Sequence, residues 1–561
     1  MRIIALKTSM IARRIGRSVP DALKRPENVV LVVWCALVVA FASARRDFNG
    51  DGLRHLPHVL SSTHPALGEP RWLLFPTLLF TTVRPFVLAG IVRDVESATR
   101  PFLALSVASG IIYLLSLRTL LVALGIESSR RGAALALAGA AAPLLVYSSD
   151  ITEPLAAASV AVAGLAFAAT QAHEPQHARK GVLVAVTAIA LASLIYQGVL
   201  LAIMLLPCVV PPRTLLERRT SIGAVAILGM VPATLMAVLM IEGNSAGHAL
   251  ERLLFGEENQ LFRSFLKSPS LSAYPVALLA GPPQGIIPIP NFSGVRGVIG
   301  MLRDPPVAIA GAFAIAIFAF CLFLIMAGVV STIGRRDWAL LVGFGGILIL
   351  PLVRHQQYAY LKFYVLLPAV LALAAARISP GRVAAAAVIV ATINGMAIAA
   401  DIERGRALYT DMAPVYSHAG ARACWVTSGW GPPLEFKWPG TTCALLLTLA
   451  TGRGEDPVSL IRGQHGLLTG CLEQCFCEAA SVLTDDMTVQ SRARIRWVAG
   501  YFGFTAVDLD SVLWRSGSGH MVLGRDAPAV LTYSEPEQKK ICEQLRAGSA
   551  VRTGFLASHE W

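Results

Sequence analysis

The chain has 561 residues, of which 55% are hydrophobic and only 15% are charged, whereas soluble domains carry about 25% charged residues. Its repeated apolar runs of about 15 to 25 residues predict a polytopic membrane protein and exclude an ordinary soluble enzyme. The net charge is +13, but the basic residues gather before the first apolar segment and in short loops, not in a stripe interleaved with aromatic residues. This distribution argues against nucleic acid as a partner.

The apolar segments predict about eleven transmembrane helices, with the N-terminus in the cytoplasm. In this orientation every cytoplasmic loop holds a basic pair or triple, as the positive-inside rule requires. The first segment ends in Ala42-Ser43-Ala44, which has the form of a signal-peptide cleavage site, but the long basic lead and the later spans favour an uncleaved signal anchor. We expect a multi-pass protein of a bacterial-type inner or plasma membrane, with spans near residues 28–44, 102–125, 132–147, 154–170, 182–194, 196–210, 221–241, 306–332, 338–353, 358–376 and 383–400.

Two segments differ from ordinary spans. Residues 72–92 are long enough to cross a bilayer but contain two prolines and Arg84, and counting them as a span would place every later basic pair outside. We therefore expect an interfacial or re-entrant element there. Residues 182–210 form one apolar run with Tyr196-Gln197-Gly198 near its centre. Two short helices that meet near the outer face would keep the next basic triple inside.

The chain divides into a membrane domain of residues 1–400 and a soluble extracytoplasmic domain of residues 401–561. The tail contains short β-like runs, among them Ala423–Thr427 and His520–Leu523, separated by Gly/Pro turns. The expected fold class is therefore an all-α polytopic membrane domain followed by an α/β domain. Six cysteines lie in the tail, where an oxidising compartment favours disulfides: Cys424, Cys443, Cys471, Cys475, Cys477 and Cys542.

Two carboxylates, Asp47 and Asp51, lie in the polar loop that follows the first span. Ionisable groups beside a bilayer are costly to place and commonly functional. A second acidic pair, Asp150 and Glu153, lies in the tight turn Tyr147–Pro154 between two later spans. The expected orientation puts both pairs on the extracytoplasmic face, so the candidate chemistry lies on one side of the membrane.

The order of these features resembles the GT-C superfamily of membrane glycosyltransferases, which includes protein mannosyltransferases and lipid A aminoarabinose transferases. In that family an acid in the first outward loop is followed by a juxtamembrane helix, a basic pair, a span rich in small residues and an outward acidic turn. The resemblance covers about residues 28–210, and Gln197 replaces a lysine that the family often has. The corresponding pieces are Asp51, Trp72–Pro76, Ser128–Arg131, Gly132–Pro143, Tyr147–Glu153 and Ile195–Gly198.

The resemblance implies an enzyme that transfers a sugar from a polyprenyl-phosphate carrier to a glycan, lipid or protein acceptor, inverting the anomeric carbon. Asp51 would be the general base that accepts the proton of the attacking hydroxyl, and Asp47 is the second candidate. Alternatively, both are solvated loop acids that pair with neighbouring arginines such as Arg45. Asp150 and Glu153 would orient the acceptor or bind a divalent cation; the alternative is that this turn only caps a helix.

Cations near the outer interface are candidates for binding the carrier phosphate. Arg84 lies in the interfacial element, and Arg354 and His355 directly follow a span. Such groups would neutralise the charge that develops on the leaving phosphate. Snorkelling toward the headgroups of membrane lipids explains any one of them as well.

Three other functions remain open at this stage. A polysaccharide polymerase or ligase would use an outward loop and arginines without an acid after the first span. A transporter of lipid-linked glycans would need charges at the bilayer midplane and repeated halves, and the sequence has few such charges and no internal repeat. A catalytically inactive membrane scaffold is the third.

The segment 242–305 is a long outward loop in the expected topology. Loops of this length in compact proteins are usually functional or disordered, and this one fits a lid over the substrate.

Overall fold

The computed structural model describes most of the chain between residues 25 and 419 and five strands beyond it. The described ranges are 25–45, 73–92, 95–150, 153–172, 174–241, 245–247, 249–250, 285–286, parts of 316–324, 326–334, 337–354, 364–419, and the strand residues between 423 and 533. Six helices within these ranges are long and apolar enough to cross a membrane. They are α2 (Pro26–Ala44), α5 (Val95–Ala123), α8 (Glu153–Gln171), α9 (Pro175–Ile195), α12 (Arg218–Ile241) and α20 (Pro380–Ala419).

Shorter helices lie in several of the remaining apolar segments, as far as the structure describes them. A break at Ala141 divides the third predicted span into α6 (Ser128–Ala140) and α7 (Ala142–Tyr147). The run 182–210 is interrupted at Tyr196, as the sequence predicts, although α9 already begins at Pro175 and is longer than expected. The remaining short helices are η3 (Gln197–Leu205), α10 (Leu206–Val209), α11 (Pro212–Leu216), α18 (Trp338–Arg354) and α19 (Leu367–Ala375).

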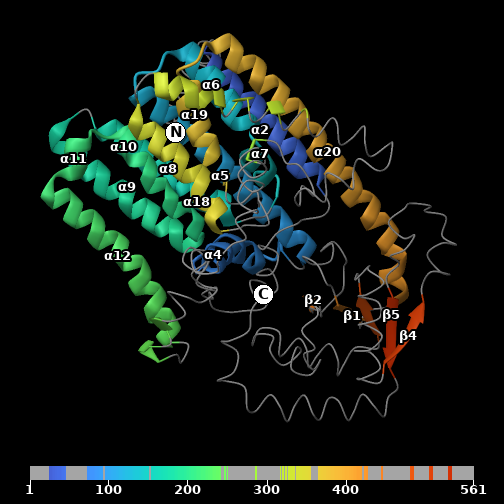
Figure 1. Ribbon diagram of the computed structural model, residues 1–561. Coiled ribbons are helices and arrows are strands. Elements are labelled where there is room, and N and C mark those ends of the chain that lie inside the picture. The colour runs from blue at the N-terminus through green and yellow to red at the C-terminus, as the bar shows by residue number, and fades with distance from the viewer. Residues whose placement is uncertain are drawn as a thin grey trace, which may run out of the picture.

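The interfacial element is α4 (Phe75–Leu88), a helix of 14 residues. At 1.5 Å per residue it is about 21 Å long, shorter than the ~30 Å hydrocarbon core of a bilayer. This length agrees with the expectation that residues 72–92 do not cross the membrane. Figure 1 shows α4 at the end of the helical bundle that lies nearer the strands.

Small residues allow the helices of the bundle to approach closely. The face of α8 that packs against α5 and α9 is rich in buried alanine. A Cβ atom at Gly164 of α8 would lie 2.7 Å from the Cβ of Ala188 in α9, closer than two carbon atoms can pack. Close packing of small residues is a main source of association between helices in a bilayer, where water provides no hydrophobic drive.

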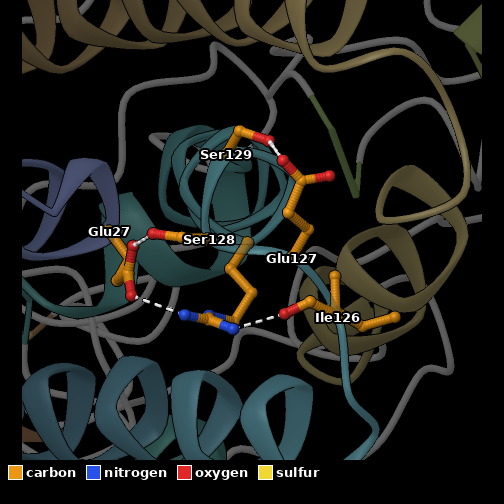
Figure 2. A network of polar contacts seen from close by, with 6 residues as sticks. Glu27, Ile126, Glu127, Ser128 and Ser129 are labelled. Atoms are coloured by element: carbon orange, nitrogen blue, oxygen red, sulfur yellow. Dashed lines mark hydrogen bonds and ion pairs between the residues drawn. The ribbon is translucent and has the colours of Figure 1, made fainter.

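A buried polar network joins the expected cytoplasmic ends of α2 and α6. Glu27 is fully buried and accepts a hydrogen bond from the Ser128 hydroxyl, while Arg131 Nη2 lies 2.9 Å from Glu27 Oε1. Arg131 also donates to the backbone oxygen of Ile126, and Figure 2 shows these contacts gathered at the start of α6. The network fixes the beginning of the first span against the third.

The last long helix leads from the bundle to the strands. α20 passes through residue 400, where the sequence suggested a domain boundary, and ends at Ala419. Beyond it lie β1 (Ala423–Val426), β2 (Ala444–Leu445), β3 (Ser481–Thr484), β4 (Phe504–Asp508) and β5 (Ala529–Tyr533). They form one sheet in the order β2-β1-β3-β5-β4, in which β1 is parallel to β2 and β3, and β5 is antiparallel to β3 and β4.

The strand expected at Ala423–Thr427 is present as β1, whereas the run His520–Leu523 lies outside the described residues. The side chains of the six tail cysteines also lie outside the described part, so their disulfides stay a prediction. Cys35 of α2 and Cys208 of α10 are free thiols that pack against the main hydrophobic core.

Candidate functional site

The site is built where the first span ends and the fourth begins. α2 ends at Ala44 and is followed by Arg45, while α7 ends at Tyr147 and α8 begins at Glu153. In the orientation expected from the basic loops, these three helix ends face the extracytoplasmic side. The turn Ser148–Asp150 between α7 and α8 therefore lies at the level of Arg45.

A buried ion pair connects these two places. Arg45 Nη1 lies 3.7 Å from Asp150 Oδ2, and the two side chains are only 2% and 6% exposed. Charges removed from water to this degree carry a large desolvation penalty, and each is tolerated because the other compensates it. The pair thus joins the residue that opens the first outward loop to the acidic turn.

Glu153 adds a second buried carboxylate to the turn. It is 1% exposed and is the first residue of α8. The amide groups at a helix N-terminus carry partial positive charge and stabilise a negative side chain there. Ser148 and Ser149 are also fully buried, and their hydroxyls donate back to backbone oxygens of α7. The acidic turn is therefore part of the packed core, unlike a solvated loop.

The turn packs closely against Gly110 of α5, which also lies next to Trp34 of α2. A Cβ atom at residue 110 would lie 2.1 Å from Ser148 Oγ and 2.6 Å from Cη2 of Trp34. The Trp34 indole N–H donates to the carbonyl oxygen of Gly139, at 2.9 Å. Because only glycine fits at residue 110, the sequence fixes how closely the turn approaches α5.

α4 packs beside these helix ends. Phe75 and Leu79 share a buried apolar cluster with Ala42, three residues before Arg45. The N–H of Leu74 donates to the backbone oxygen of Leu194 in α9, at 2.9 Å. α4 is thereby fixed to both α2 and α9.

The predicted phosphate ligand Arg84 lies on α4. It is partly buried, and its guanidinium carbon lies 5.8 Å from the centre of the Phe80 ring, within cation–π distance. Phe86 and Leu88, farther along the same helix, are exposed. A helix that carries a cation and exposed apolar side chains suits a membrane interface.

The other predicted site residues are placed only in part. Asp47, Asp51 and His355 lie outside the described residues, and Arg354 is the last residue of α18, with its side chain also outside them. Among the described residues, no three His, Cys, Asp or Glu side chains are grouped so as to hold a metal ion. Of the predicted site residues, the structure thus describes Asp150 and Glu153, both buried at the ends of the turn between α7 and α8, and Arg84 on α4, which packs against α2 and α5.

Sequence reasoning assigned Arg45 only the role of a partner for Asp47 or Asp51, and the structure pairs it with Asp150. A signal for this was present, because Arg45 follows the last apolar residue of the first span. A cation at that point must either reach water or find a buried anion. A contact between residues so far apart in the chain has no signature in a single sequence, so the partner could not be predicted.

No family model and no curated protein sequence matches the chain. Among solved structures, ArnT from Cupriavidus metallidurans in the apo state is 15% identical with a TM-score of 0.40, and the match covers 91% of this chain and 98% of that one. ArnT bound to undecaprenyl phosphate is 14% identical with a TM-score of 0.41, at the same coverage. The Archaeoglobus fulgidus oligosaccharyltransferase in complex with zinc and sulfate is 12% identical with a TM-score of 0.43, covering 84% and 69% of the two chains.

ArnT and the oligosaccharyltransferase are both members of the GT-C superfamily. Identities of 12–15% with TM-scores of 0.40 to 0.43 are too low to support a conclusion about this chain. The chemistry of the present protein is therefore inferred from its own residues.

Proposed function

We propose that the chain is a membrane glycosyltransferase of GT-C type, which transfers a sugar from a polyprenyl-phosphate carrier to an acceptor on the extracytoplasmic face. The observation that carries the proposal is the buried pair of Arg45 and Asp150. It brings the start of the loop that contains Asp51 to the acidic turn.

In the proposed reaction Asp51 is the general base. It takes the proton of the acceptor hydroxyl while that oxygen forms a bond to the anomeric carbon, and the bond from this carbon to the phosphate oxygen breaks. The sugar leaves the carrier with inversion, and the polyprenyl phosphate departs with the bonding electron pair. Asp51 is six residues beyond Arg45, and an extended chain of that length spans about 20 Å, so the pair limits where this carboxylate can lie.

The remaining residues serve binding. Arg84 on α4, with Arg354 and His355, is proposed to neutralise the carrier phosphate, because leaving-group charge in a partly dehydrated site needs nearby cations. Asp150 and Glu153 are proposed to orient the hydroxyls of the acceptor. A divalent cation on these carboxylates is the alternative. Asp47 is the alternative base, and the acceptor is proposed to be a glycan, lipid or protein.

A transfer assay on the full chain in lipid nanodiscs tests this proposal. Polyprenyl-phosphate sugars of several kinds are supplied with a panel of acceptors, and release of the free polyprenyl phosphate is measured. We expect Asp51→Asn to lower the rate by at least 100-fold, in line with general-base contributions of about 10²- to 10⁴-fold. Glu174→Gln, whose side chain is 71% exposed, is the matched control and should leave the rate unchanged. Full activity of Asp51→Asn would contradict the base assignment.

A further inference from the structure

The break between α6 and α7 is a polar point inside the helical bundle. Ala141 adopts an extended conformation (φ −62°, ψ 140°), so the regular hydrogen-bond ladder is interrupted there. The carbonyl oxygen of Ala140 accepts a hydrogen bond from the Asn394 side-chain amide of α20, at 2.6 Å. The N–H of Ala142 donates to the backbone oxygen of Ile286, at 3.0 Å. These bonds satisfy backbone groups that the break exposes.

Asn394 also donates to Ile286, so one side chain bridges both partners. Its Nδ2 atom lies 2.8 Å from the Ile286 oxygen, and the residue is fully buried. An amide with two hydrogens suits two carbonyl acceptors, which a hydroxyl or an aliphatic side chain could not satisfy. Asn394 is therefore matched chemically to this break.

In the orientation expected from the basic loops, the helix lengths place the bridge at bilayer depth. Asn394 is 14 residues beyond Pro380, the start of α20, which corresponds to about 21 Å along the helix. Ala140 lies 12 residues into α6, about 18 Å from its start by the same measure. Unsatisfied backbone groups in a bilayer cost several kcal/mol each, and a polar side chain there is expected to have a specific role.

The bridge is close to the acidic turn. α7 has only six residues, and it links the break at Ala141 to Ser148–Asp150. Ile286 belongs to the segment 242–305, which the sequence places outside the membrane, and yet it is fully buried in the main core. A shift of Ile286 or of α20 would be passed through one short helix to Asp150.

We propose that Asn394 is a positioning residue, which holds Ile286 in the break between α6 and α7 and thereby sets the position of Asp150 against Arg45. Asn394 acts through α7 and does not itself touch the reacting atoms. The catalytic consequence rests on the proposed function: loss of the bridge lowers kcat about 10- to 100-fold, because small misplacements of a site cost that much. The KM for the lipid donor changes little, since α4 is not attached to the bridge.

The test is hydrogen–deuterium exchange of the full chain in nanodiscs, with transfer kinetics measured in parallel. In Asn394→Leu, which has similar volume and no amide, the amides of residues 141–150 should exchange at least tenfold faster. Thr392→Val, a change on the exposed side of the same helix, should leave them unchanged. Asn394→Gln keeps both N–H donors and should restore much of the protection. Asn394→Ser, a milder change, gives the same measurement where the leucine variant folds poorly.

The outcomes separate the two proposals. Unchanged exchange at 141–150 in both Asn394→Leu and Asn394→Ser overturns the positioning role, whatever the enzyme does. Faster exchange without any transfer activity in the unmodified protein supports the bridge and overturns the proposed function. Faster exchange with an unchanged kcat shows that the bridge does not position the site, and this also overturns the inference.

Discussion

The indole nitrogen of Trp34 and the carbonyl oxygen of Gly139 lie 2.9 Å apart, and the glycine is what permits this contact. A Cβ atom at residue 139 would lie 2.8 Å from Cδ1 of Trp34. The hydrogen bond and the close approach together attach α2 to α6, just before the break that leads to the acidic turn. The contact between α2 and α6 at this point therefore requires glycine at residue 139.

We predict that Gly110→Ala and Gly139→Ala destabilise the protein, by about 1–3 kcal/mol each as for overpacked cores. Gly110→Ala should be the more severe change, because its Cβ meets both Ser148 and Trp34. Gly229→Ala, in α12, is the matched control, since a Cβ there meets nothing within 4 Å. Thermal unfolding in detergent, followed by size-exclusion chromatography, measures the difference. Equal melting temperatures for all three variants would contradict the packing described at Gly110.

The ion pair of Arg45 and Asp150 should be costly to break on one side only. Asp150→Asn leaves a buried guanidinium without its full countercharge, and losses of about 3–5 kcal/mol are typical of such changes. The double change Arg45→Met with Asp150→Leu removes both charges and should recover most of the stability. It should recover no transfer activity, because the acidic turn would lack the Asp150 carboxylate that is proposed to orient the acceptor. A double variant that is less stable than Asp150→Asn would show that the two charges do not compensate each other.

Two neighbouring arginines of α6 should behave differently. Arg130 is exposed, whereas Arg131 reaches buried Glu27. Arg131→Gln should therefore lower the melting temperature by several degrees, while Arg130→Gln should have almost no effect. The positive-inside rule treats both as topology signals, so the melting temperatures distinguish a structural role from an orienting one. Glu27→Gln should reproduce the effect of Arg131→Gln.

Arg84 should affect binding of the lipid donor. If its guanidinium contacts the carrier phosphate, Arg84→Gln raises the KM for the donor about tenfold, the effect of losing one charge-assisted hydrogen bond of about 1.5 kcal/mol. Arg84→Lys keeps the charge and should show a smaller increase. Initial rates at varied donor concentration provide the measurement. An unchanged KM in Arg84→Gln would indicate that Arg84 serves the membrane interface alone.

The helical segments could be read from the sequence because they depend on local composition. Apolar runs and basic loops located α2, α5, α8, α9 and α12, and two prolines with Arg84 set residues 72–92, which contain the 14-residue helix α4, apart from the ordinary spans. The acidic pair Asp150 and Glu153 was found because charges are conspicuous between apolar spans. Each of these signals is local, because it depends on residues that are close together in the sequence.

The remaining features depend on contacts between distant parts of the chain. The residues near Asn394 do not predict its contacts with Ala140 and Ile286, since a single polar residue in an apolar helix has many potential partners. The pairing of Arg45 with Asp150 and that of Glu27 with Arg131 also cannot be predicted from a single sequence. The break at Ala141 was missed because alanine favours a helix and the interruption is stabilised from outside.

The bond from the N–H of Leu74 to the oxygen of Leu194 involves no side chain. Every residue except proline can supply that N–H, so this one bond between the start of α4 and the end of α9 does not depend on the amino acids that it joins. The exposed side chains of α4, such as Phe86 and Leu88, can therefore vary while this bond and the buried residues Phe75 and Leu79 keep the helix in place. Proline at residue 74 is the one substitution that would remove this bond.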